Sequence, residues 1–158
     1  MPRMIPAPDD PDEAAASHIG WGSLEEIAGF HVRMAQAAIY RDFCAKMKAI
    51  NLSQTQYAVL VLVSANPGVS QIDLARSIGS DRATMMALVN RLELRRLVER
   101  TLSETDRRKQ ELRLTVEGAA TLKRAAGVIA KHEKSAFAGL SADETATLVR
   151  LLKKVYLG

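Results

Sequence analysis

The sequence predicts a mainly α-helical fold with one β-hairpin, and three observations support this prediction. Apolar residues recur at helical spacing along most of the chain, which is typical of amphipathic helices. Capping sequences, prolines and glycines divide these stretches into separate helices. After the fourth helix the apolar period changes to alternation, which is typical of half-buried strands. The expected order of elements is α-α-α-α-β-β-α-α.

The first helix is expected over residues 23–50. Ser23 and Glu26 match a reciprocal capping box, in which each side chain bonds a backbone amide at the helix start. No proline interrupts the helical pattern before Ile50. Cys44 lies near the end of this helix, where we expect it to be a small buried hydrophobic side chain.

A second, short helix is expected around the apolar run 57–63. Ser53 and Gln56 match another capping box at its start. The Asn-Pro-Gly sequence at 66–68 must turn the chain after it, because proline lacks an amide hydrogen and glycine tolerates positive φ.

The third and fourth helices follow closely and are separated by a glycine. The third runs from Ser70 to Ile78, and Gly79 can end it as a glycine C-cap. Ser80 or Asp81 caps the fourth helix. The inward face of this fourth helix is expected to carry Met85, Leu88, Val89 and Leu92.

The pattern of the remaining residues predicts a hairpin and two further helices. Residues 97–102 and 111–115 alternate between apolar and polar side chains, so we expect a hairpin with a charged tip at 103–110. The helical period resumes over 116–137. A capping box at 141–144 then opens a final helix.

Length and composition favour one globular domain. The chain has 158 residues, of which 47% are hydrophobic and 25% charged, the mix of a soluble protein. No apolar stretch approaches the ~20 residues that cross a bilayer as a helix. With Cys44 as the only cysteine, no internal disulfide or multi-cysteine zinc site can form. Since no export signal opens the chain, we expect a cytoplasmic protein without membrane partners.

Charge is distributed unevenly along the chain. Residues 1–22 contain four of the five prolines and a net charge of −3, a composition that does not fold alone, so we expect a flexible acidic arm there. The formal net charge of the whole chain is +4, which leaves +7 on residues 23–158. A basic domain attracts polyanions, nucleic acid above all, although a solubilising surface has the same composition.

The sequence contains none of the common catalytic or cofactor signatures. There is no glycine-rich phosphate loop, no His-Glu-x-x-His metal pair, no Glu-x-x-His motif and no serine elbow. His18, His31 and His132 lie far apart in sequence, so a metal site would need the fold to gather them with carboxylates. We therefore expect a protein that is not an enzyme and binds no cofactor or metal ion.

The third and fourth helices and the hairpin together indicate a function. In a helix-turn-helix the second helix stands clear of the body and enters the DNA major groove. Arg82 suits a guanine edge, and Asn90 suits an adenine edge or a phosphate. On the two helices, the residues that we expect to contact DNA are Ser70, Gln71, Arg82, Ala83, Thr84, Met86 and Asn90. Without the hairpin, a three-helix bundle with a solvated polar face would be the simpler interpretation.

The hairpin tip carries three consecutive cations, Arg107, Arg108 and Lys109. Neighbouring side chains of an extended segment point to different sides, so all three cannot form ion pairs within one sheet. Such a tip fits the minor groove or the flanking phosphates, and Asp106 is placed to pair with Arg108 and stiffen the loop. A solvated turn is the alternative.

The same residues resemble those of a known family. Segment 106–118 contains the pattern Asp-x-Arg followed by Leu-x-Leu-Thr-x-x-Gly. Three shorter matches support it, Leu-Ser-Gln-Thr-Gln-Tyr-x-x-Leu at 52–60, Leu-Ala at 74–75 and Asp-Arg-Ala-Thr at 81–84. Over residues 23–157 the chain resembles the MarR-type (multiple antibiotic resistance regulator) winged helix-turn-helix transcription factors.

One position departs from the family pattern. Members usually have glycine after the recognition helix, in Leu-Glu-x-x-Gly-Leu-Val, where this chain has Arg96. Either Arg96 adopts a left-handed backbone, which glycine accepts most easily, or the turn differs locally.

The resemblance implies a winged helix-turn-helix over residues 53–115, flanked by dimerisation helices at 23–50 and 116–157. It implies a homodimer whose recognition helices enter successive major grooves of a near-palindromic operator. The implied function is that of a DNA-binding transcriptional regulator, in the simplest case a repressor. The terminal helices agree with a dimer, because each has an apolar face without a partner in so small a domain.

The resemblance further implies release from DNA by a small organic effector, such as an aromatic carboxylate or its thioester. By analogy, the effector pocket would be formed by Phe30, His31, Met34, Ala38 and Tyr57. His31 would be the polar anchor for a carboxylate. The alternative for His31 is a core histidine bonded to a backbone carbonyl.

Two other functions remain open. Some family members sense peroxide through a thiol in the first helix, and Cys44 offers a thiol here, although near the end of that helix rather than its start. A winged-helix module that binds protein is the other alternative. Binding that weakens steeply with salt is expected for DNA and not for a mainly apolar protein interface.

Overall fold

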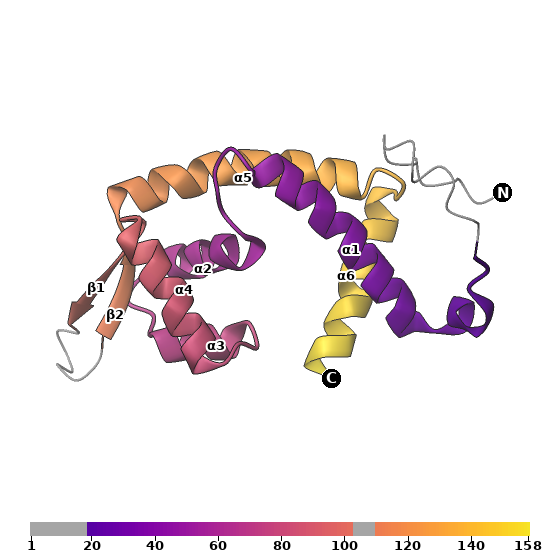
Figure 1. Cartoon of the computed structure of the whole chain (residues 1–158), viewed down its shortest axis with the longest axis horizontal. Coiled ribbons are helices and arrows are strands. Elements are labelled where there is room, and N and C mark those ends of the chain that lie inside the picture. Colours follow the sequence, from indigo (N-terminus) through magenta and orange to yellow (C-terminus); the bar gives the residue numbers. More distant parts are fainter. Residues whose placement is uncertain (1–18, 103–109) are drawn as a thin grey trace. The chain divides into compact units, whose positions relative to one another are not determined.

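The computed structural model describes residues 19–102 and 110–158 and is drawn in Figure 1. Most of the expected acidic arm over 1–22 lies outside these residues. The chain divides into two compact units, Met1–Ala37 and Ala38–Gly158. Among the helices of the described residues, none has both the length and the apolar character that crossing a membrane requires.

The observed elements confirm the mainly α-helical fold with one hairpin. They are the 3-10 helix η1 (Gly22–Glu26), the helices α1 (Ala28–Met47), α2 (Gln54–Ala65), α3 (Gln71–Ser77) and α4 (Arg82–Leu94), the strands β1 (Val98–Leu102) and β2 (Gln110–Leu114), and the helices α5 (Val116–Ala136) and α6 (Ala142–Leu157). The two strands are antiparallel, with Val98 opposite Leu114. Val69, just before α3, forms one further bridge to Leu112, so the hairpin is also attached to the helix-turn-helix.

The start of the first helix differs from the prediction. Residues Gly22–Glu26 form η1, which has no side-chain cap, so the capping box expected at Ser23 is wrong. Ile27 is extended and cannot continue a helical hydrogen-bond ladder, and α1 therefore begins only at Ala28. The single helix expected over 23–50 is thus a short 3-10 helix followed by a shorter α-helix.

The other predicted capping boxes are confirmed. The Ser53 hydroxyl accepts the Gln56 amide at 3.1 Å, and the Gln56 side chain accepts the Ser53 amide at 3.0 Å. Ser141 and Glu144 form the same reciprocal pair at the start of α6. These bonds satisfy backbone amides that have no partner within the first turn of a helix.

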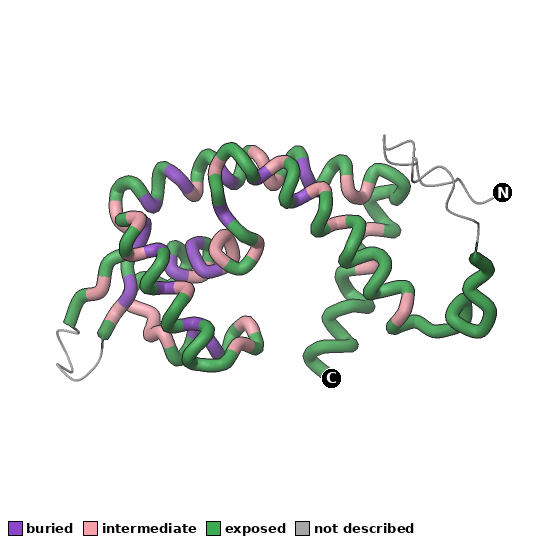
Figure 2. The backbone as a smooth tube through the Cα atoms, viewed as in Figure 1, coloured by how far each residue is buried: buried purple, intermediate pink, exposed green. Residues whose placement is uncertain are grey.

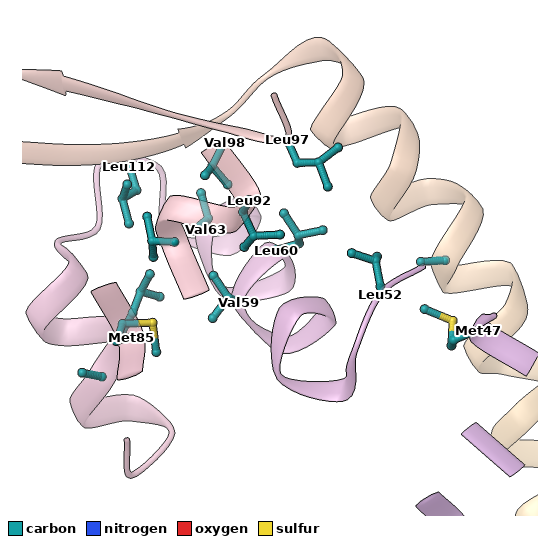
Figure 3. Close-up of a cluster of buried hydrophobic side chains, with 14 of the residues drawn as sticks. Met47, Leu52, Val59, Leu60, Val63, Met85, Leu92, Leu97, Val98 and Leu112 are labelled. Carbon is teal, nitrogen blue, oxygen red and sulfur yellow. The ribbon is translucent and has the colours of Figure 1, made fainter. Parts of the chain in front are cut away.

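The hydrophobic core gathers where α2, α3, α4 and the hairpin meet the first half of α5 (Figure 2). Met85, Val89 and Leu92 are fully buried, which confirms the predicted inward face of α4. Figure 3 shows Met85 and Leu92 packed with other side chains from α2 and the hairpin, among them Val59, Leu60, Val63, Val98 and Leu112. Burial of each such side chain stabilises the fold by ~1.5–3 kcal/mol, so α4 is held by this face and keeps the opposite face exposed.

A buried histidine joins α1 to α5 within the larger unit. The His132 side chain is 2% exposed, and its Nδ1 lies 2.5 Å from Oδ2 of Asp42. Phe43 packs edge-on against the imidazole. Lys46 and Ser135 also donate to Asp42, and the Lys46 bond is the main reason that the pKa of Asp42 is lowered. Across the described residues, no three His, Cys, Asp or Glu side chains gather as a metal ion would require.

Cys44 is exposed, so the expectation of a buried side chain is wrong. The buried face of this part of α1 carries Phe43 and Met47, which lie four residues apart. Cys44 is displaced from Phe43 by about 100° around the helix, and so falls outside that face.

The hairpin is fixed at its base by a close approach between Leu97 and Gly118. A Cβ at Gly118 would lie 1.8 Å from the Leu97 carbonyl oxygen, so only glycine fits there. The Thr115 amide donates to the same Leu97 carbonyl at 3.2 Å. The Thr115 hydroxyl donates to the Arg96 carbonyl at 2.5 Å and accepts the Gly118 amide at 2.9 Å. Because β1 follows Leu97 and β2 precedes Thr115, this junction holds both ends of the hairpin.

Arg96 has a φ of 55°. Of the two alternatives for this position, a left-handed backbone at Arg96 or a locally different turn, the structure confirms the left-handed backbone. The Arg96 amide donates to the Glu93 carbonyl at 2.8 Å and closes the end of α4. The arginine thus keeps the turn that glycine would make, at the cost of a Cβ in an unfavourable backbone region.

Gly118→Ala is expected to lower the free energy of unfolding by about 3 kcal/mol, because the added methyl group must displace the Leu97 backbone. Urea unfolding followed by circular dichroism measures the difference. Gly127→Ala is the matched control on the same helix, since nothing lies within 4 Å of a Cβ at Gly127, and it should be neutral or stabilising. Equal losses from the two substitutions would contradict the contact.

Arg96→Gly is expected to raise the free energy of unfolding by about 0.5–1 kcal/mol, because glycine adopts positive φ without the steric penalty of a Cβ. The same unfolding measurement checks it. Arg96→Ala removes the charge and keeps the Cβ, so no gain is expected from that control. A gain from alanine equal to that from glycine would mean that the charge, and not the backbone, is responsible.

Candidate nucleic-acid interface

Helix α4 is set at its start by a glycine turn and an aspartate cap. After α3 ends at Ser77, Gly79 has a φ of 65° and redirects the chain as predicted. Asp81, rather than Ser80, caps α4, and its carboxylate accepts the Thr84 amide at 2.8 Å. The side-chain hydrogen bond with Thr84, and after it the Thr84 amide, lower the pKa of Asp81. The ionised carboxylate also complements the positive end of the helix dipole.

The outward face of α4 is exposed and begins with small side chains. Of the residues predicted to contact DNA, the exposed ones on this helix are Arg82, Ala83, Thr84, Met86 and Asn90. Arg82 is the first helical residue. Because only alanine and threonine follow it within the first turn on this face, the backbone can approach a groove closely.

The two predicted contacts near the start of α3 are engaged within the protein. Ser70 caps α3, since its hydroxyl accepts the Asp73 amide at 3.1 Å and donates to the Asp73 carboxylate at 2.7 Å. The Gln71 side-chain oxygen accepts a bond from Arg100 at 3.3 Å. Both residues are half-buried, and their contact with DNA stays a prediction.

Arg100 on β1 links the elements of the helix-turn-helix and was missed by the sequence analysis. Its Nη2 donates to Asn90 Oδ1 at 2.5 Å as well as to Gln71, and its Nη1 pairs with the Glu93 carboxylate. The Arg100 side chain is only 18% exposed. No local pattern indicated it, because the partners on α3 and α4 lie up to 29 residues away in sequence.

Arg95 attaches the end of α4 to the turn between α1 and α2. Its guanidinium donates to the Asn51 carbonyl at 2.6 Å and to the Ile50 carbonyl at 3.3 Å. These carbonyls follow the end of α1 and have no partner in a continued helix. Together with Asp81 at the start, this contact fixes α4 at both ends.

The hairpin tip stays a prediction. Arg107, Arg108, Lys109 and Asp106 lie outside the described residues, so neither a minor-groove contact nor a pairing within the tip is tested. The strands that lead to the tip are joined to the core, since Val98 and Leu112 are buried.

Three of the predicted effector residues lie in the smaller unit. Phe30 and His31 lie with their ring centroids 5.1 and 6.2 Å from that of Trp21. The His31 Nε2 lies 2.8 Å from the Glu25 carbonyl oxygen. This contact to a backbone carbonyl agrees with the alternative of a core histidine, but the His31 side chain is exposed and so does not belong to a core. Met34 is 37% exposed.

The other two predicted effector residues lie in the larger unit. Tyr57 is half-buried against the core, and Ala38 is exposed on α1. The effector pocket as a whole stays a prediction.

The chain is similar in sequence to transcriptional regulators. Residues 50–109 match the model of the MarR family. A protein of Thauera aromatica assigned as a transcriptional regulatory protein for the hcr operon is 35% identical over 136 residues, which cover 85% of this chain and 82% of that protein.

Solved structures of the transcriptional repressor CouR are similar as well. CouR bound to a 23-mer DNA duplex is 35% identical, with a TM-score of 0.84, and the match covers 89% of this chain and 99% of that chain. CouR bound to p-coumaroyl-CoA is 33% identical, with a TM-score of 0.80, covering 87% of this chain and 97% of that chain. Both matches extend well beyond the segment that the family model covers.

Proposed function

The chain belongs to the MarR family of winged helix-turn-helix transcriptional regulators, and on this premise we propose that it binds duplex DNA as a homodimeric repressor released by a small effector. The observation that carries the proposal is the exposed start of α4, where Arg82 is followed by small side chains. Such a face fits the major groove, whose base edges an α-helix can reach.

DNA recognition is divided between α4 and the hairpin tip. Arg82 contacts a guanine edge, and its neighbours Ala83, Thr84 and Met86 line the groove. The tip cations Arg107, Arg108 and Lys109 contact the minor groove or its phosphates, with Asp106 orienting Arg108. The net charge of +7 on residues 23–158 supports this proposal, because cations that neutralise phosphates release condensed counterions.

The terminal helices support a homodimer. None of the residues of α6 is buried (Figure 2). Its exposed residues include the large hydrophobic side chains of Val155, Tyr156 and Leu157, which are 80%, 68% and 74% exposed. An open groove of about 820 Å³ at the end of α5 and the first half of α6 is lined by apolar side chains such as Phe137 and Val149. Apolar surface of this kind marks an interface, and a two-fold dimer presents two recognition helices to a near-palindromic operator.

The effector is an aromatic carboxylate or its thioester, bound by Phe30, His31, Met34, Ala38 and Tyr57. The CouR complex with p-coumaroyl-CoA, an aromatic thioester, supports this choice of chemistry. His31 would anchor the carboxylate or carbonyl among otherwise apolar side chains. Regulation of this kind places the protein in the cytoplasm, where both DNA and acyl thioesters are present.

A thiol switch at Cys44 is the second candidate for release. The exposure of Cys44 favours it, because peroxide oxidises accessible thiols. Cys44→Ser separates the two, since only a thiol switch loses its peroxide response in that variant.

Arg82→Ala is expected to weaken binding to the DNA upstream of the protein's own gene by about 1–3 kcal/mol and to relax base preference. Arg108→Ala should weaken binding to that fragment and to a shuffled duplex by similar factors. Electrophoretic shifts at several salt concentrations measure both, and wild-type affinity should fall by orders of magnitude between ~50 and ~200 mM salt. An affinity that does not change with salt concentration would instead favour the alternative of a protein-binding module.

Aromatic acids or their thioesters are expected to change the emission of Trp21, the only tryptophan, because it adjoins Phe30 and His31. Fluorescence titration measures the affinity, and the same ligands should release the DNA complex at matching concentrations. His31→Ala should weaken this affinity roughly tenfold, by loss of a charge-assisted hydrogen bond. A ligand that releases DNA without altering Trp21 emission would place the pocket elsewhere.

A further inference from the structure

The Arg100 guanidinium is committed to the protein and is not free for DNA. It lies largely buried, is paired with Glu93, and donates to the side-chain oxygens of Asn90 and Gln71. A salt bridge formed by a mostly buried arginine cancels the charge that a phosphate would need. Arg100 therefore affects DNA binding only through the residues that it holds.

The bond from Arg100 decides which half of the Asn90 amide is available. A side-chain amide has one accepting oxygen and one donating NH2 group. Reading adenine requires both, because the oxygen accepts from N6 while the nitrogen donates to N7. The Asn90 oxygen accepts from Arg100 Nη2 at 2.5 Å. This bond turns the oxygen toward β1 and uses one of its two lone pairs, so the NH2 group is the half of the amide that the bond leaves wholly available to a ligand.

Gln71 at the start of α3 is held in the same way. Its oxygen accepts from the same Nη2 at 3.3 Å, and its NH2 group is likewise the half left for another partner. Two amide donors, one from each helix of the helix-turn-helix, are thus oriented by a single guanidinium. Phosphate oxygens only accept hydrogen bonds, so they match this pair of donors, whereas adenine N6 would have to donate to an oxygen that already accepts from Arg100.

We propose that Arg100 is a positioning residue that turns the Asn90 and Gln71 amides toward the DNA backbone, so that Asn90 binds a phosphate and does not read adenine. The proposal rests on the proposed DNA-binding function. In this arrangement the first turn of α4, around Arg82, contacts the bases, while Asn90 and Gln71 fix the position of the helix along the duplex.

The test compares Asn90→Ala, Asn90→Asp and Arg100→Gln on two duplexes, the fragment upstream of the protein's own gene and a shuffled duplex of equal composition. Asn90→Ala should weaken both complexes by the same factor, roughly three- to tenfold. Asn90→Asp should weaken both further, because its carboxylate repels phosphate, while its pairing with Arg100 keeps the melting temperature from falling.

Arg100→Gln should weaken both complexes without changing the slope of log affinity against log salt, since Arg100 itself neutralises no phosphate. A direct phosphate contact by Arg100 would instead reduce that slope by about 1. In the Arg100→Gln background, Asn90→Ala should cost less than about twofold, because the two residues act as one unit. If the Arg100→Gln variant unfolds, Arg100→Lys replaces it in the test, because lysine keeps the charge and loses the planar set of guanidinium donors.

Arg124→Gln is the matched control. It removes another guanidinium, one that bonds to Glu117 and Thr121 on its own helix α5, so affinity should stay within about twofold. Relaxed preference at one A·T pair in Asn90→Ala, or a reduced salt slope in Arg100→Gln, would overturn the inference. Wild-type protein that binds neither duplex would instead overturn the proposed function.

Discussion

The approach of the Gly118 backbone to the Leu97 carbonyl is the constraint on which the winged helix-turn-helix depends. At this point the end of α4, both ends of the hairpin and the start of α5 come together. Because no side chain fits between the two backbones, the hairpin cannot shift along α5 without breaking the Thr115 bonds. The position of the hairpin relative to α4 and α5 is therefore set at this junction by the close backbone approach and by the Thr115 bonds.

The features that the sequence predicted well are those whose partners lie close together along the chain. The capping boxes at Ser53 and Ser141 each join residues three apart, and the inward face of α4 follows from helical periodicity alone. The box at Ser23 matched equally well by residue type and failed, because the 3-10 helix already begins at Gly22 and Ser23 lies inside it rather than at its N-cap. A local sequence pattern thus identifies possible capping boxes, and the backbone conformation around each one determines whether the box forms.

The features that the sequence could not predict depend on contacts between distant residues. His132 and Asp42 are 90 residues apart, and nothing near either residue marks them as a pair. Arg100 is one of many arginines in the chain and lies on a strand of alternating pattern, while its partners lie on α3 and α4. Gly118 was noticed only as part of a family motif, and the Leu97 carbonyl supplies the physical reason for it.

The exposed thiol on α1 has a practical consequence. Cys44 is the only cysteine of the chain, so a nitroxide spin label can be attached at one defined point without altering any other residue. Two labelled copies in one assembly would give a single inter-label distance. Changes in that distance on adding DNA or a small molecule would report how the first helices of the two copies move relative to each other.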